Sequence, residues 1–214
     1  NPLHPEPGRL LQGIYWAFAD WPQWYLHRKD AWPLFSTIRS QFCKMVPGKI
    51  SGFMKCILRA FFADTGDSFS RGCIIQHGNE SKMFTAEFCG FITDEKALKE
   101  IFDIKGQAGC FPCFDCMNVG YKRSRNNPDL VTIACTDQSK FQHRTTPILT
   151  EMKSRLDEAP NKTQREALEK RFGMNHSPHG LLWDIDLYNR VLNGTSNYLR
   201  DGMHTLYSNG VAGT

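Results

Sequence analysis

The sequence contains no apolar run of the roughly 18–20 residues that a helix needs to cross a bilayer, so it predicts no membrane protein. It has no charged segment followed by an apolar one near residue 1, which is the pattern of a secretory signal. No acidic or low-complexity tract occurs, and 41% hydrophobic and 22% charged residues are typical of a globular protein. The formal net charge of +4 over 214 residues permits nucleic-acid binding but does not indicate it.

The two ends of the sequence lack the features of a complete chain. Residue 1 is Asn rather than Met, and the chain stops shortly after Gly210 with no closing element. We therefore expect a fragment of a longer protein, truncated at both ends. A site that is completed by residues outside the fragment would then be incomplete in it.

Eight cysteines are present, an even number that would also suit disulfides. The chain is long, has enough apolar residues for a core and shows no secretory signal, so we expect free thiols in a reducing, intracellular compartment. Four of the cysteines have apolar or helix-like neighbours, where a free thiol behaves as a small core residue. The others cluster in one segment: Cys110, Cys113, Cys116 and Cys135.

The first half of the chain alternates strand and helix signals, which predicts a mixed α/β fold. The expected elements are a strand or short helix at 10–18, a strand at 31–38 with Pro33 at its start or on an edge, a helix at 52–63 capped by Ser51, strands at 72–76 and 82–92 around a hairpin loop at 77–80, and a helix opening at Thr93-Asp94-Glu95 and closed by Gly106. The strand at 82–92 is expected to run into Asp94.

The second half is predicted to be largely helical after a segment, 107–145, that is rich in Cys, Gly, Asn and basic residues. The pattern of residues 147–172 predicts a helical hairpin, with Pro147 at the first helical position and Gly173 as the closing residue. A capping-box pattern at Thr163-Gln-Arg-Glu166 predicts the start of its second helix. Another apolar stretch covers 181–192, and 198–207 is expected to be helical.

The strongest local motif is Cys110-Phe-Pro-Cys113-Phe-Asp-Cys116. Two thiolates separated by two residues can bind one tetrahedral Zn²⁺ from a tight turn. No second CxxC occurs, so the remaining ligands would come from scattered residues: Cys110, Cys135, His143, His176, His179 and His204. The alternative is three reduced thiols in a loop. A redox role would need a thioredoxin-like strand and helix around the motif, which the sequence does not show.

Two further positions carry candidate chemistry. Asp94 ends an apolar strand, where a carboxylate can project into a cleft, but an Asp at this position also caps a helix. Asp201 and His204 are three residues apart and would share one helix face, an arrangement that can bind a metal. The alternative for this pair is a surface Asp and a partly buried His.

A basic stretch adjoins the cysteine cluster and ends in Lys122, Arg123 and Arg125. Lys140, His143 and Arg144 follow it. Basic side chains with nearby aromatic residues can contact nucleic-acid phosphates, although a solvated loop would have the same composition. The Trp-rich stretch between Trp16 and Trp32 is better explained as packing than as a platform for stacked bases.

The order of these signals is more specific than any one of them. A strand ending in Asp94, a helix, a CxxC nineteen residues after Asp94, a largely helical insertion and then Asp201-Gly-Met-His204 resembles the catalytic region of eukaryotic cut-and-paste DDE transposases, above all the V(D)J-recombinase-like branch. Those enzymes have an RNase H-like core, whose second catalytic Asp ends a core strand. In that branch, the Cys pair and downstream His residues share a zinc ion.

The chain resembles more closely a multicopy family of mobile-element-like protist proteins of uncharacterised function, and this resemblance covers most of its length. The resembling stretches are Asn1-Pro2-Leu3 through Trp32, Ser36-Thr-Ile-Arg39, Phe91-Ile-Thr-Asp94-Glu-Lys-Ala97, Lys105-Gly106, Pro112-Cys113-Phe-Asp-Cys116-Met-Asn118-Val119 and Asp201-Gly-Met-His204.

The transposase resemblance carries roles to individual residues. It implies that Asp94 is the second catalytic carboxylate, that Cys113 and Cys116 are the zinc pair, and that His204 is the first downstream His with Asp201 as its motif partner. The first catalytic Asp would lie upstream of residue 1 and the catalytic Glu beyond Thr214. A further zinc ligand would be His143 or Cys135, or would lie beyond the chain.

The implied organisation has four parts. Residues 1–106 would be an RNase H-like core portion with a mixed sheet and flanking helices, 107–145 a zinc-knuckle-like Cys-rich segment, 146–197 a helical insertion, and 198–214 a return helix toward the core.

The implied function is DNA binding and DNA strand transfer with catalytic Mg²⁺ or Mn²⁺ and a structural Zn²⁺. The full-length protein would be a DDE transposase or its inactive descendant, in an intracellular, nuclear location, and the resemblance also allows a homo-oligomer. Lys122, Arg123 and Arg125 are the candidate DNA contacts. The alternative is a non-catalytic, zinc-stabilised module that binds nucleic acid or protein.

Overall fold

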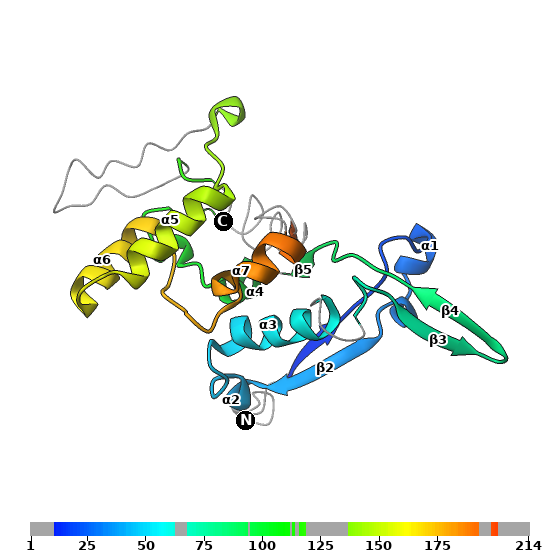
Figure 1. Cartoon of the computed structure of the whole chain (residues 1–214). Coiled ribbons are helices and arrows are strands. Elements are labelled where there is room, and N and C mark those ends of the chain that lie inside the picture. The colour runs from blue at the N-terminus through cyan, green and yellow to red at the C-terminus, as the bar shows by residue number, and fades with distance from the viewer. Residues whose placement is uncertain are drawn as a thin grey trace, which may run out of the picture.

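The computed structural model describes residues 11–62, 68–93, 95–111, 113, 116–118, 137–192 and 198–200, and these form a mixed α/β structure (Figure 1). The strands are β1 Leu11–Tyr15, β2 Leu34–Arg39, β3 Cys73–His77, β4 Glu80–Phe84, β5 Phe91–Thr93 and β6 Tyr198–Arg200. The α-helices are α1 Gln23–Leu26, α2 Ser40–Cys43, α3 Lys49–Phe62, α4 Glu95–Ile101, α5 Thr146–Asp157, α6 Lys162–Phe172 and α7 Ile185–Leu187. None of the described helices is long and apolar enough to span a bilayer.

The strands pair two by two within the described residues. β1 and β2 are antiparallel, with Leu11 opposite Arg39, and β2 begins directly after Pro33 as expected. β3 and β4 form the predicted hairpin around Gly78 and Asn79. β5 pairs with β6 in parallel. The mixed α/β class is therefore confirmed.

The expected single strand at 82–92 is wrong. β4 ends at Phe84, residues 85–90 have no regular structure, and β5 begins only at Phe91. Gly90 precedes β5 with φ 155°, in a region that favours glycine, so the backbone does not continue as one regular strand. β4 therefore belongs to the hairpin, and β5 belongs to the parallel pair.

The helix expected at 52–63 is confirmed, with a start three residues earlier than predicted. Ser51 does not cap this helix, because it lies within α3 and is fully buried. Its hydroxyl oxygen instead accepts a hydrogen bond from Leu181 N–H at 2.8 Å. The buried residues Met54 and Leu58 lie four apart on α3, and this apolar stripe faces the core.

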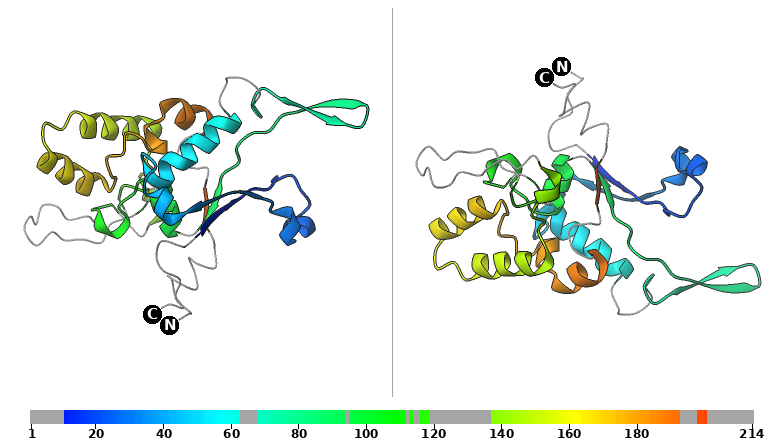
Figure 2. Two further views of the ribbon diagram at one scale, coloured as in Figure 1. Left: turned by 90° about the horizontal axis from the view of Figure 1, so that it is seen from below. Right: turned by 90° about the horizontal axis from the view of Figure 1, so that it is seen from above.

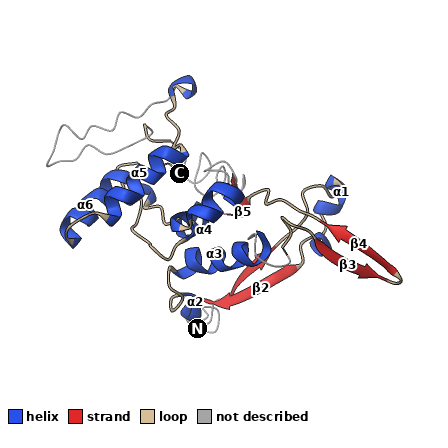
Figure 3. Cartoon of the chain, in the orientation of Figure 1, coloured by secondary structure: helices blue, strands red, loops and turns tan. Residues whose placement is uncertain are grey.

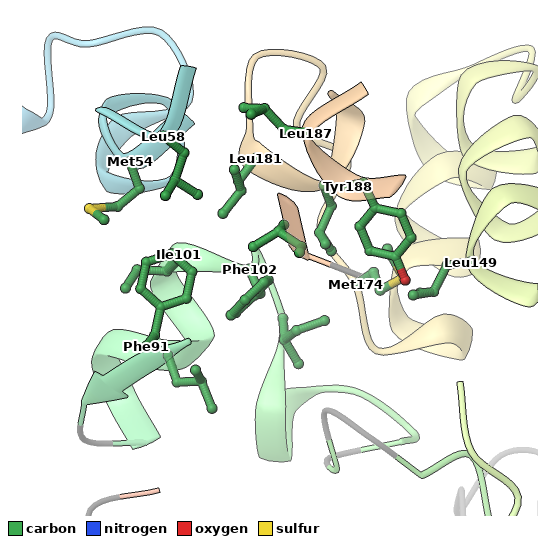
Figure 4. Close-up of a cluster of buried hydrophobic side chains, with 14 of the residues drawn as sticks. Met54, Leu58, Phe91, Ile101, Phe102, Leu149, Met174, Leu181, Leu187 and Tyr188 are labelled. Carbon is green, nitrogen blue, oxygen red and sulfur yellow. The ribbon is translucent and has the colours of Figure 1, made fainter. Parts of the chain in front are cut away.

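The main core lies where α3, α4, α5, α6 and α7 meet (Figure 4). Figure 4 shows Phe102, which follows α4, between the side chains of α3 and those around Tyr188. A bidentate ion pair also joins α3 to the start of α7: Arg59 donates from Nε and, at 2.8 Å, from Nη2 to the carboxylate of Asp184. The same carboxylate caps α7 by accepting from Leu187 N–H at 3.2 Å.

The helical hairpin expected at 147–172 is confirmed as α5 and α6, with Pro147 in the first turn of α5 and Gly173 as a left-handed C-cap of α6. The predicted capping box is wrong. Asn161, two residues before Thr163, is the N-cap of α6, and its side-chain oxygen accepts from Gln164 N–H at 2.9 Å. Figures 2 and 3 show this helical hairpin at the opposite end of the molecule from the β3–β4 hairpin.

The return helix expected from residue 198 begins instead as a strand. Residues 198–200 form β6, and the rest of 198–214 lies outside the described residues. Tyr198, Leu199 and Arg200 pair with Phe91, Ile92 and Thr93 in order. Parallel strands need a long crossover between them, and residues 94–197 supply it here.

Candidate metal centre

The CxxC motif forms a turn that is closed by its own sulfur. The backbone N–H of Cys116 donates to Cys113 Sγ at 3.2 Å. Cys116 is buried and Cys113 is half-buried, and neither is in a disulfide. An N–H donated to sulfur stabilises a thiolate, which is the form that binds a metal.

The turn is fixed to a second segment that carries His143. Cys116 and His143 lie opposite each other in an isolated antiparallel bridge, and Met117 N–H donates to the carbonyl of Gln142 at 2.8 Å. Asn118 reinforces the pairing by donating from Nδ2 to the carbonyl of Lys140 at 2.7 Å and by accepting from Gln142 N–H at 3.0 Å. Directly opposite residues in such a pair carry their side chains on the same face, so Cys116 and His143 belong to one candidate site.

The chain before the CxxC motif is attached to the C-terminal end of α6. Lys105 N–H donates to the carbonyl of Gly173 at 2.9 Å, and Cys110 N–H donates to the carbonyl of Lys170 at 2.8 Å. Gly173 has φ +68°, and a Cβ at this position would lie 2.3 Å from the carbonyl oxygen of Phe111. This close approach requires glycine at position 173.

Two of the scattered histidines lie outside this arrangement. His176 Nε2 is 2.8 Å from Asp157 Oδ1, which also accepts from Trp183 Nε1 at 3.2 Å. His179 is exposed, and its backbone packs against Gly48 at the start of α3. Both residues are predicted as available ligands, but in the structure His176 joins the end of α5 to the loop before α7.

The candidate donors in this region, the thiols of Cys113 and Cys116 and the imidazole of His143, are of the kinds that Zn²⁺ prefers. Within the described ranges, however, no group of three or more His, Cys, Asp and Glu side chains has the arrangement of a metal site. Three protein donors would also leave a structural zinc site one ligand short. The residues present fit part of a zinc site, with the turn and the bridge as its framework.

The remaining predicted residues lie outside the described part of the chain: Asp94, Lys122, Arg123, Arg125, Cys135, Asp201 and His204. The neighbours of Asp94 are described, since β5 ends at Thr93 and α4 begins at Glu95. This position, between a strand end and a helix start, agrees with both interpretations of Asp94.

A large open groove borders the end of β5 and the first turn of α4. It has a volume of about 3010 Å³ and runs between β1, α3, β5 and α4, and both Thr93 and Lys96 line it. Its walls are rich in aromatic rings, for example Trp16 stacked on Phe69 with ring centroids 6.4 Å apart.

Asp103 is an interior carboxylate in this groove that the sequence analysis did not single out. Burial raises its pKa to about 6, while the neighbouring hydroxyls of Ser51 and Ser177 and the charge of Lys49 act in the opposite direction. A Cβ on Gly180 would lie 2.3 Å from Asp103 Oδ2, 2.8 Å from Ser177 Oγ and 2.9 Å from Ser51 Oγ. Two separate segments, α3 and the loop of Ser177 and Gly180, therefore converge on one carboxylate, and no local sequence pattern could have indicated this.

Comparison with known proteins gives no match to a protein-family model, to a curated protein or to a solved structure.

Proposed function

We propose that the chain is part of a DDE-type DNA strand-transfer domain with an RNase H-like mixed sheet and a helical insertion held by structural zinc. The parallel pairing of β5 with β6, in which Thr93 lies opposite Arg200, is the observation that carries this proposal. The carboxyl ends of neighbouring parallel strands lie at the same edge of a sheet. Asp94 follows Thr93 and Asp201 follows Arg200 in the sequence, so the register supports a common edge for the two motifs.

The position of the insertion agrees with the same proposal. The CxxC turn and the α5–α6 hairpin both lie in the crossover between β5 and β6. The transposase resemblance requires this order: the second catalytic Asp, then the CxxC, then a helical insertion, then the DxxH motif. A zinc ion bound by Cys113, Cys116, His143 and His204 would tie the insertion to the strand that returns to the sheet.

In the proposed site, Asp94 would hold a divalent metal together with an Asp upstream of residue 1 and a Glu beyond Thr214. When bound, Mg²⁺ or Mn²⁺ ions activate water or a 3′-hydroxyl and stabilise the leaving oxygen at a phosphodiester. The groove beside Thr93 and Lys96 offers room for DNA at this edge. Lys122, Arg123 and Arg125 would contact phosphates, which positions DNA without reading its sequence.

A second candidate function, a zinc-stabilised module without catalysis, is favoured by one observation. The position of Asp94 directly precedes α4, where an Asp side chain can cap the helix and interact favourably with its dipole. In that case, the CxxC turn would stabilise a nucleic-acid or protein-binding domain.

The substitution Asp94→Asn in the full-length protein separates these functions. We expect DNA cleavage to fall about a hundredfold or more, since one of three metal-holding carboxylates is lost, while zinc content and DNA affinity stay unchanged. The matched control is Asp186→Asn, at an exposed position on α7, which should cleave normally. Cleavage that is unaffected by Asp94→Asn would exclude the catalytic role.

Zinc binding is tested by elemental analysis of the purified chain. We expect bound zinc in the wild type and its loss in the double variant Cys113→Ser/Cys116→Ser. The matched control is Cys56→Ser/Cys89→Ser, because Cys56 and Cys89 are also free but exposed and distant in sequence from the motif. Wild-type protein purified without zinc, and unable to take it up, would contradict both candidate functions.

A further inference from the structure

The β3–β4 hairpin projects from the rest of the molecule as a two-stranded ribbon (Figures 1 and 2). Within the described residues, neither of its strands pairs with a third strand, so the outer edges of both are open. Ile74 and Ile75 of β3 are exposed apolar side chains. A hairpin of two strands is marginally stable at best in water, and additional strands stabilise it. The hairpin is therefore suited to pairing with a further strand.

The two open edges of the hairpin differ in charge. β3, with the sequence Cys73-Ile-Ile-Gln-His77, contains no Asp, Glu, Lys or Arg. β4 carries Glu80 and Lys82, whose side chains form an exposed ion pair at 3.2 Å. Charged side chains, Lys above all, protect the edge of a sheet against pairing with another chain. The edge of β4 has this protection, and the edge of β3 lacks it.

The edge of β3 is complementary to a copy of itself. His77 and Glu80 flank the two-residue turn of the hairpin, and from this pair the direction of the backbone groups alternates along the strands. The N–H and C=O groups of Ile74 and Gln76 therefore point away from β4. In an antiparallel pair of two β3 strands with Ile75 opposite its own copy, all five residues of each strand are paired. The two Ile75 side chains then occupy a non-hydrogen-bonded position, where opposite side chains lie closest.

The other ways of pairing two hairpins are less favourable. Two β4 strands in the corresponding register would place Lys82 opposite its own copy, and like charges directly opposite each other are destabilising. Pairing β3 of one copy with β4 of the next would leave an open edge at each end, so that the assembly grows into a fibre. Glu80 and Lys82 oppose this pairing as well. The pairing of β3 with β3 is closed, with the charged β4 strands as its outer edges.

We propose that the edge of β3 is an interface for a second copy of this chain, through which two β3–β4 hairpins form a four-stranded antiparallel sheet. The two Ile75 side chains meet at the two-fold axis of this dimer. A contact of five residues per strand is smaller than the interfaces of about 1,200 Å² or more that stable complexes use, so the dimer is weak and depends on concentration. The inference does not depend on the proposed strand transfer or on zinc.

Sedimentation equilibrium of the purified chain, from about 5 to 500 µM, tests the dimer in the range expected for a small interface. We expect a monomer–dimer equilibrium for the wild type. Ile75→Lys should weaken it about tenfold or more, because two positive charges then face each other across the axis. The matched control is Met83→Lys, which introduces the same charge at an exposed apolar position on β4 and should leave the dissociation constant within about threefold of the wild type.

A mixing experiment tests the register. Ile75→Lys and Ile75→Glu should each be largely monomeric, and their equimolar mixture should form a heterodimer, because opposite charges then lie opposite each other. A mixture of Met83→Lys and Met83→Glu should associate no better than either variant alone. Circular dichroism shows whether each variant folds. Should a charged variant not fold, Ile75→Thr keeps a β-branched residue and should still weaken the dimer.

Three results would overturn the inference. The first is a wild-type chain that stays monomeric over the whole concentration range. The second is a wild-type chain that grows beyond a dimer, since this would indicate pairing of β3 with β4. The third is unchanged dimerisation of the folded Ile75 variants, which would place the interface elsewhere on the molecule.

Discussion

The α5–α6 hairpin and the β3–β4 hairpin differ in how completely they bury their apolar side chains. In the insertion, Leu149, Leu156 and Phe172 of the α5–α6 hairpin are almost fully buried. In the β3–β4 hairpin, Ile74 is 69% exposed and its partner across the strands, Met83, is 74% exposed. Two-stranded ribbons of this kind have little stability of their own. The comparison teaches that the α5–α6 hairpin is part of the main core, whereas the β3–β4 hairpin depends on packing at one end, where Phe84 contacts Phe18 and Phe69.

The largest expected effect tests this comparison directly. Leu156→Ala should lower the free energy of unfolding by about 2–5 kcal/mol, because it opens a cavity in a fully buried part of α5. Ile74→Ala removes a similar side chain from the exposed ribbon and should cost less than about 0.5 kcal/mol. Urea unfolding followed by circular dichroism measures both values. Similar costs for the two substitutions would show that the ribbon is buried in solution.

The stability of the packed part of the molecule should also depend on pH, because it contains Asp103. Its pKa is about 6 in the folded chain and 3.8 as an unperturbed group, so the folded state binds this proton more tightly. Asp103 therefore destabilises the fold above about pH 6, and this cost disappears as the pH falls through 6 toward 4. From the difference between the two pKa values, the full effect is roughly 3 kcal/mol.

The substitution Asp103→Asn should raise the stability at pH 7.5 and remove most of the change between pH 7.5 and pH 4.5. Unfolding curves at the two pH values measure it. The control is Asp137→Asn, which should not raise the stability at pH 7.5. Asp137 is exposed, and hydrogen bonds from Ser139 and Lys140 lower the pKa of its carboxyl group. Should Asp103→Asn destabilise the chain at pH 7.5, the favourable interactions of the carboxylate with Ser51, Ser177 and Lys49 would outweigh the cost of burial.

The ion pair between Arg59 and Asp184 joins α3 to the start of α7, and its two members should contribute unequally to the free energy of unfolding. Asp184→Ala removes a buried carboxylate that also caps α7, and we expect a loss of about 2–3 kcal/mol. Arg59→Met should cost less, about 1–2 kcal/mol, because the Arg59 side chain is 51% exposed and Asp184 keeps its hydrogen bond from Leu187 N–H. Equal losses for the two single substitutions would mean that the hydrogen bond between Asp184 and Leu187 N–H contributes nothing to stability.

Much of the fold could be predicted because the local signals in those parts of the chain agree with the packing. The stripe of Met54 and Leu58, the hairpin around Gly78 and the stop at Gly173 all depend on neighbours close in sequence. The break after Phe84 could not be predicted, because β4 and β5 find different partners far away in the chain. The sequence predicts a helix at 198–200 instead of a strand for the same reason: the apolar residues fit either period, and the pairing with β5 decides.

The candidate site also has one part that the local sequence predicts and another part that depends on distant segments. The CxxC spacing alone indicates the turn that Cys113 and Cys116 form, since the hydrogen bond that closes it spans three residues. The pairing of Cys116 with His143, and the burial of Arg144 and Asp103, arise from contacts between distant segments. Sequence composition could suggest His143 as one ligand among several, but it could not select it over His176.

The smallest expected effect concerns the start of α6, where the sequence pattern and the structure disagree by two residues. Asn161→Ala should cost about 1 kcal/mol, because the side chain that accepts from Gln164 N–H is lost and that donor is left to water. Thr163→Ala should change the stability by less than about 0.5 kcal/mol, since Thr163 lies within the helix and is exposed. Thermal unfolding of the two variants is the measurement. A larger loss for Thr163→Ala would restore the capping box and move the start of α6. Because the α5–α6 hairpin is packed into the core, a substitution at the start of α6 should change the free energy of global unfolding. A substitution in the turn at Gly78, in the exposed β3–β4 hairpin, should not.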